Sequence, residues 1–166
     1  MRRPPVLVLL VAAGSLAVAG CHGVTRTTRN GVEPMVTAGL PATRMAACKA
    51  VTRGDVEMVL DEQVTKATAA SGPNGSTSCV YQGSLGTVTV RVDPTTGRSA
   101  YDAARRAAPD AEPTDGVGDD GFYSARAHTL SAVKGGAQVT ITFALTEPQD
   151  ELETGSELAR RAISRF

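Results

Sequence analysis

Three cysteines have the most versatile chemistry in this chain, because a thiol can be acylated, oxidised to a disulfide or bound to a metal. They are Cys21, Cys48 and Cys79. Redox or metal chemistry would need a C-x-x-C pair or histidines at ligand spacing, and the sequence has neither, since His22 and His128 are far apart. The cysteines therefore indicate acylation or disulfide formation, and we expect no metal and no cofactor.

Residues 116–121 match the G-x-G-x-x-G pattern of dinucleotide-binding loops. Such a loop must lie between a strand and a helix, whereas this one precedes the strand-like pair Phe122-Tyr123. Its carboxylates, Asp119 and Asp120, would also repel phosphates. The segment is therefore predicted to be a turn that leads into a strand.

The loop from Asp115 to Asp120 has a second possible role. Its carboxylates, Asp115, Asp119 and Asp120, could hold Ca²⁺, but their spacing departs from the D-x-[DN]-x-[DN]-G pattern of calcium-binding loops. Solvated loop carboxylates are the simpler interpretation.

Hydrolysis would need a nucleophile, a base and an orienting acid. His128 is the only histidine of the predicted domain, and no G-x-S-x-G or S-x-x-K motif lies near it. We therefore expect a polar strand residue at His128 and a chain that is not an enzyme. The alternative is an unrecognised site whose polar groups converge near His128 or the loop from Asp115 to Asp120.

The N-terminus favours export and acylation of Cys21. Two arginines precede a largely apolar stretch of 14 residues, Val6 to Ala19, which is shorter than the about 20 residues that a membrane-spanning helix needs. The small residues Ala19 and Gly20, directly before Cys21, resemble the lipobox of bacterial lipoproteins. The alternative is an ordinary secretory peptide with Cys21 incidental.

The lipobox resemblance implies that residues 1–20 are a signal peptide and that Cys21 carries diacylglycerol, with acyl chains such as palmitate in the membrane. Two or more chains anchor a protein stably, where a single chain is marginal. The expected location is thus the extracytoplasmic face of the cell membrane. Residues 21–47 comprise this cysteine and a flexible tether, which shows neither helical nor strand periodicity.

With Cys21 assigned to lipid, Cys48 and Cys79 remain as a pair in an exported chain. An oxidising compartment favours a disulfide between them. The bond would close a loop of about 30 residues and contribute on the order of 3 to 4 kcal/mol in the chain-entropy model.

Charge argues against nucleic acid as a partner. The chain has 17 Lys+Arg and 17 Asp+Glu, and loss of residues 1–20 removes two arginines, which leaves no basic excess to neutralise phosphates. Only 4% of residues are aromatic, so surfaces for base stacking are few. The pairs Arg105-Arg106 and Arg160-Arg161 could contact an anionic partner, but solvated helix faces are the simpler interpretation.

Residues 48–166 are predicted to form a single α+β domain. Capping patterns predict helices that begin at Thr52, Ser99 and Thr146, each with an acidic or amide residue three positions on. Strands are predicted at 79–81, 87–92, 122–123, 128–133 and 139–145, with a hairpin turn at Gly135-Gly136. The strict alternation of the last strand favours antiparallel pairing. We expect a small antiparallel sheet with helices packed on one face and one disulfide.

Two side-chain patterns refine this prediction. In the last helix, Leu152, Ala159, Ile163 and Phe166 form an expected core-facing stripe, although Gly155 interrupts the helical pattern. In the last strand, Gln138, Thr140 and Thr142 indicate that one side of the sheet meets water or a polar partner.

The order of these features resembles the actinobacterial lipoproteins that share a domain of unknown function, DUF3558. The resemblance rests on Cys21, Cys48, Cys79, the segment 116–119 (Gly-Val-Gly-Asp) and the segment 158–162 (Leu-Ala-Arg-Arg-Ala). It covers nearly the whole chain after the signal peptide. One departure is Tyr81, where members of the family often carry Trp.

The resemblance brings no catalytic residues, so it implies a location and a fold and leaves the ligand-binding residues unassigned. We expect a non-catalytic binding domain, held at the membrane by its lipid, that binds a protein or cell-envelope component. The domain is expected to be a monomer. The alternative is a small-ligand or lipid sensor with a pocket between sheet and helices.

Overall fold

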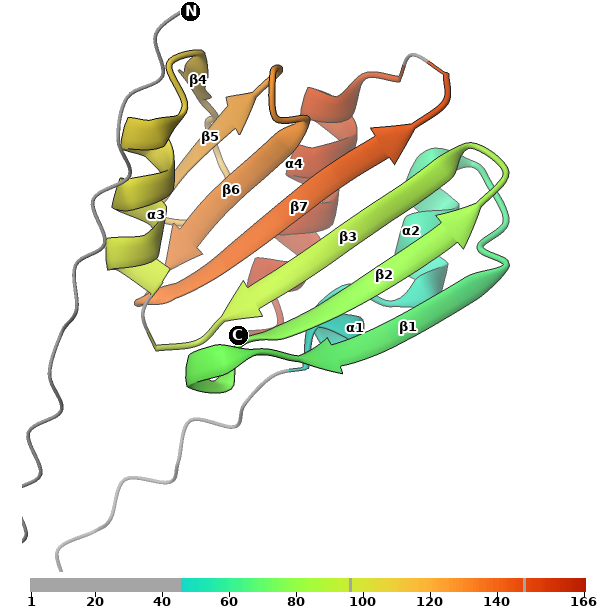
Figure 1. Ribbon diagram of the computed structural model, residues 1–166, viewed down its shortest axis with the longest axis horizontal. Helices are drawn as coiled ribbons and strands as arrows, with labels where there is room; N and C mark the ends of the chain where they lie inside the picture. Colours follow the sequence, from blue (N-terminus) through green and yellow to red (C-terminus); the bar gives the residue numbers. More distant parts are fainter. Residues whose placement is uncertain (1–45, 96, 148) are drawn as a thin grey trace, which may run out of the picture. The chain divides into compact units, whose positions relative to one another are not determined.

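The computed structural model describes residues 46–95, 97–147 and 149–166. The predicted signal peptide, Cys21 and the predicted tether up to residue 45 lie outside the described residues. The described residues form a seven-stranded antiparallel sheet with helices packed against it (Figure 1). This confirms the predicted α+β class, the antiparallel sheet and the disulfide.

In the described residues the helices are α1 (Ala47–Ala50), α2 (Arg53–Leu60), α3 (Gly97–Ala107) and α4 (Glu151–Ile163). The strands are β1 (Lys66–Ser71), β2 (Thr77–Gly83), β3 (Gly86–Asp93), β4 (Ala111–Pro113), β5 (Asp120–Ser124), β6 (Thr129–Lys134) and β7 (Ala137–Leu145). A short 3₁₀ turn, Pro73–Gly75, joins β1 to β2. The order across the sheet is β1-β2-β3-β7-β6-β5-β4.

The predicted beginning of α2 is confirmed. The Thr52 side chain accepts a hydrogen bond from the Asp55 backbone N–H at 3.2 Å, and the Asp55 carboxylate accepts the Thr52 N–H at 2.7 Å. Val51 and Val56, on either side of this cap, are both buried. The cap and the two valines together fix where the helix begins.

The main core lies on the sheet face that α1, α2 and α4 cover. Residues paired across antiparallel strands share a face, so Cys79, Val90 and Ile141 form one row of this core. The buried side chains around them include Val56, Tyr81, Val88, Leu130, Phe143 and Leu158.

Among the helices described, α3 lies against the opposite face. Tyr101 of α3 packs on Phe122 of β5 with ring centroids 5.3 Å apart, and Val133 of β6 completes this second, smaller cluster. β6 is therefore covered on both sides. The prediction placed the helices on one face, and α3 is the difference.

Two predicted helix beginnings are wrong. Ser99 lies inside α3, which begins at Gly97. The N–H of Gly97 donates to the Gly136 carbonyl oxygen, and a Cβ at Gly97 would lie 2.4 Å from that oxygen, so the helix can approach the β6–β7 turn only at a glycine. α4 begins after Asp150, whose side chain accepts the Glu153 N–H, and not after Thr146.

The predicted stripe of α4 is correct only in its middle. Ala159 and Ile163 are buried, whereas Leu152 and Phe166 are exposed. Gly155 does not interrupt the helix. It is buried, and a Cβ there would meet the Leu130 side chain at 3.1 Å, so glycine lets α4 pack closely on β6.

Candidate functional site

The disulfide joins α1 to β2. Cys48 and Cys79 have Cα atoms 5.1 Å apart, and Cys79 is buried. A backbone hydrogen bond from Ala47 to the Thr77 hydroxyl, at 2.9 Å, holds the same two elements together. Cys21, the predicted lipidation site, lies outside the described residues. Of the three predicted site residues, the structure therefore describes Cys48 and Cys79.

A buried carboxylate joins α2 to the end of α4. The Asp55 side chain is 7% exposed and accepts hydrogen bonds from Arg165 at 2.6 Å and Arg161 at 3.3 Å. Arg165 also donates to the Ala50 carbonyl oxygen at 2.7 Å. The hydrogen bonds from Arg165 hold the pKa of Asp55 well below its usual range, although burial acts in the opposite direction. The Asp55 carboxylate is paired with both arginines, so we assign this cluster a structural role: it holds α2 against the end of α4.

A second polar group combines three residues that are far apart in the sequence. His128 lies in the turn before β6 with a left-handed φ of 49°, so it is not the strand residue that the sequence predicted. Its Nδ1 is 2.9 Å from Oε2 of Glu151, the first residue of α4, and the same oxygen accepts the Tyr123 hydroxyl at 2.8 Å. Burial, followed by the hydrogen bond to Glu151, raises the pKa of Tyr123.

An imidazole that a carboxylate holds at Nδ1 is also the geometry of a catalytic base. The His128 side chain is 60% exposed, and among the described residues its ring contacts only Glu151 by hydrogen bond. No hydroxyl of the described residues forms a hydrogen bond with the His128 ring. The contact between His128 and Glu151 holds the β5–β6 turn against the beginning of α4.

Asp120 is not a solvated loop carboxylate. It is the first residue of β5 and accepts the Tyr101 hydroxyl at 2.8 Å, with Arg105 at 3.3 Å and Arg98 at 3.4 Å. Burial, followed by this hydrogen bond to Asp120, raises the pKa of Tyr101 to about 12. These contacts hold α3 on its face of the sheet.

The turn before β5 is confirmed as a turn. Gly116 and Gly118 have positive φ angles of 70° and 72°, and the Asp119 carboxylate accepts the Gly135 N–H at 2.8 Å. Asp119 and Asp120 are thus directed to different partners. No cluster of three or more His, Cys, Asp or Glu side chains in the described ranges is placed to hold a metal ion.

The two arginine pairs form several ion pairs. Arg105 binds Asp120, and Arg161 binds both Asp55 and Glu157. Arg160 forms an exposed ion pair with Glu157. One arginine of each pair therefore binds a carboxylate of another element, which the expectation of a solvated helix face did not include.

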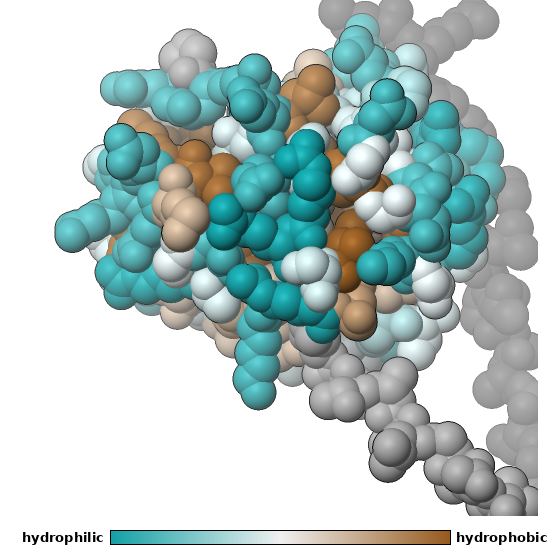
Figure 2. Space-filling model, turned by 180° about the vertical axis from the view of Figure 1, so that it is seen from behind, coloured by the Kyte–Doolittle hydropathy of each residue, from teal (hydrophilic) through white to brown (hydrophobic). Residues whose placement is uncertain are grey.

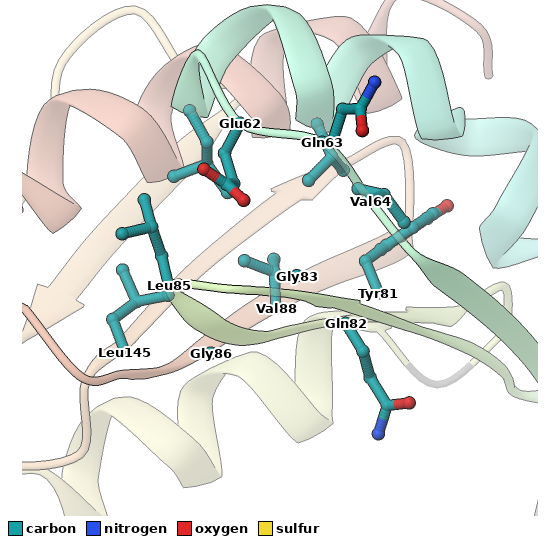
Figure 3. A pocket seen from close by; sticks show the side chains of 12 residues that line it. Glu62, Gln63, Val64, Tyr81, Gln82, Gly83, Leu85, Gly86, Val88 and Leu145 are labelled. Carbon is teal, nitrogen blue, oxygen red and sulfur yellow. The ribbon is translucent and has the colours of Figure 1, made fainter.

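The interface between the sheet and α2 is filled. Figure 3 shows Leu85, Val88 and Leu145 directed toward the segment that follows α2, while Gln82 points to the other side of the sheet. The space left between them is about 10 Å³, room for about one water molecule. A ligand pocket between sheet and helices finds no support at this interface.

Two larger hollows lie at the surface of the described domain. One of about 320 Å³ lies where α3 ends, and its lining includes four alanines together with Asp110 and Arg126. The other, of about 160 Å³, lies between α1 and the strands β1 and β2. Both are concave sites that a ligand or a partner side chain could enter.

The two sides of the sheet differ in character. Figure 2 shows the helix-covered side, where hydrophilic side chains gather across the middle and separate the hydrophobic patches. On the opposite side, Figure 1 shows no helix in front of β1, β2 and β3. That open face carries a cross-strand row of Thr68, Val80, Thr89 and Thr142.

None of the helices in the described ranges has the length and apolar character needed to cross a membrane. No family model matches the chain, and no curated protein matches it. A structural neighbour is a GTP binding regulator from Thermotoga maritima, with 10% sequence identity and a TM-score of 0.43 over 68% of this chain and 88% of that one. At that similarity neither its fold nor its ligand transfers to this chain.

Proposed function

We propose that this chain is a membrane-anchored extracytoplasmic lipoprotein of the DUF3558 type, with diacylglycerol on Cys21. The lipobox-like sequence before Cys21 supports the anchor. The disulfide Cys48–Cys79 agrees with export, because disulfides persist in oxidising compartments. The order of the three cysteines and of the segments around them supports the family.

The domain is proposed to be a non-catalytic binding module for a protein or cell-envelope component. The observation that carries this proposal is the open face of β1, β2 and β3, which no described helix covers. The face is polar, with Thr68, Thr87 and Thr89 among its side chains. A flat sheet surface suits a macromolecular partner, whereas a small molecule needs a concave site.

A small-ligand function is the second candidate, and one observation favours it. The hollow of about 320 Å³ beside α3 is lined mainly by apolar residues and by two charged residues, Asp110 and Arg126. Pockets for small molecules start at about that size. Its place differs from the predicted one, since it lies at the end of α3 and not between the core face of the sheet and its helices.

Two experiments test the proposal. The intact mass of the protein from membranes should correspond to a chain that begins at Cys21 and carries diacylglycerol, and Cys21→Ala should release the protein from membranes. Crosslinking in intact cells should then capture a macromolecule on the open face. A Cys21→Ala protein that still fractionates with membranes would refute the anchor, and crosslinks confined to small molecules at the α3 hollow would favour the second candidate.

A further inference from the structure

The two edges of the sheet are built differently. At one edge, β4 has three residues and ends in Pro113, and both features discourage further strand pairing. At the other edge, β1 has six residues, all exposed, with no proline and an unbroken register against β2. Every second residue of an edge strand directs its N–H and C=O away from the sheet. Within the described part of the chain, no further strand meets these groups.

The hollow of about 160 Å³ lies beside this open edge, on the helix side. Its walls include Ala47 and Cys48 of α1 and Ala69 of β1. Ala69 faces the helix side because it pairs across the ladder with Cys79, the disulfide partner of Cys48. A strand added beside β1 would direct alternate side chains toward this hollow and toward the open face.

The charged residues of α1 and β1 are lysines. Lys66 begins β1 and Lys49 lies in α1, and neither forms an ion pair with a described carboxylate. β1 itself contains no acidic residue. Unpaired cations favour acidic groups in whatever binds beside them.

We propose that β1 binds an extended peptide segment of a partner protein by strand addition, with an apolar peptide side chain in the hollow and acidic residues near Lys49 and Lys66. This inference rests on the proposed function, because it names the kind of partner that the binding module holds. A second copy of this chain fits less well. Its own β1 carries Ala67, Ala69 and Ser71 on the helix side, and these small side chains would leave the hollow empty.

The test uses the chain from residue 22 onward, which carries no lipid, and fluorescently labelled peptides measured by polarisation. The probe is Glu-Thr-Leu-Thr-Leu-Thr-Leu-Glu, whose leucines lie on one face of a strand. Two matched peptides replace the leucines by alanine or the glutamates by lysine. We expect the probe to bind with a Kd below about 1 mM and each matched peptide to bind about tenfold more weakly.

Two variants locate the site. Ala69→Phe fills the hollow and should weaken probe binding at least about tenfold, whereas Met58→Phe, on the exposed surface of α2, should keep the affinity within about twofold. Both residues are exposed in the free protein, and circular dichroism checks that both variants fold. Backbone amides of β1 should also exchange more slowly with solvent in the presence of the probe.

Three outcomes would overturn the inference. The first is equal binding by the two variants, or no binding of the probe at about 1 mM. The second is a dimer in sedimentation that the probe does not dissociate, which would assign the edge to a second copy. The third is binding that appears only when residues 22–45 are deleted, which would assign the edge to the chain's own N-terminal segment.

The assay contains no membrane, so a failure of the lipid-anchor proposal would leave its result intact. Conversely, capture of the same cellular partner by wild type and by Ala69→Phe would retain the proposed function and remove β1 as its site.

Discussion

Asp55 shows how a buried carboxylate contributes to the pH dependence of this fold. Its pKa lies well below the usual range because Arg165 binds it, so its contribution to stability is complete above the unfolded-state pKa of about 4 and is lost as pH falls toward the folded-state pKa. We therefore expect the free energy of unfolding to decrease below about pH 4. Asp55→Asn should remove part of that decrease in urea unfolding measured across pH. Parallel curves for the variant and wild type would contradict this assignment.

The three tyrosines give a second prediction at this scale. Burial raises the pKa of Tyr81 and of Tyr101 to about 12 and also raises the pKa of Tyr123. The tyrosinate absorbance of the native protein should therefore appear at higher pH than that of the urea-unfolded chain, whose tyrosines titrate near about pH 10. Glu151→Gln should move part of the native signal to lower pH, because the carboxylate that disfavours the Tyr123 anion is gone.

Glu153→Gln is the control for the tyrosine titration. It lies on the same first turn of α4, but the Tyr123 hydroxyl donates to Glu151 and not to Glu153. The native titration curve should be the same in this variant as in wild type. A shift of equal size in both variants would mean that helix charge in general, and not the contact with Glu151, raises the pKa of Tyr123.

At the scale of elements, the sequence predicted the helices and strands that have clear capping residues or a regular alternation of apolar residues. α2, β3, β7 and the Gly135-Gly136 turn were all found in this way. β1 was missed because its residues, Lys-Ala-Thr-Ala-Ala-Ser, have no apolar alternation. β1 is a strand because it pairs with β2. The preference of a segment for the strand conformation depends on its neighbours in the sheet more than on residue type.

The position of α3 on the opposite face was not predicted, although the sequence of β5 indicates that both faces of that strand are covered. Phe122 and Tyr123 are adjacent aromatic residues, so their side chains lie on opposite faces of β5, and both faces must then be covered. The polar group at His128 left no such signal. His128 and Glu151 are 23 residues apart, and only the docking of α4 on β6 and β7 brings them together.

Gly155 carries a prediction about the packing of α4. Gly155→Leu should destabilise the fold by about 1 to 3 kcal/mol, because a side chain there would displace Leu130 and Phe143 in a filled core. Gly54→Leu in α2 is the matched control, since its Cβ would meet only the Thr52 hydroxyl oxygen at 4.0 Å. That variant should keep or slightly raise the free energy of unfolding in urea, because leucine favours helix over glycine. Equal losses in both variants would show that helix disruption, not close packing, explains Gly155.

At the scale of the whole molecule, the three cysteines divide between two tasks that should separate in experiment. Cys48→Ser together with Cys79→Ser should lower the free energy of unfolding by about 3 to 4 kcal/mol, because a cross-link over 31 residues no longer restricts the unfolded chain. That variant should still fractionate with membranes. Cys21→Ala should do the reverse, leaving membranes while keeping the wild-type urea midpoint, because Cys21 precedes the folded domain. Loss of both properties in either variant would show that anchor and domain are one cooperative unit.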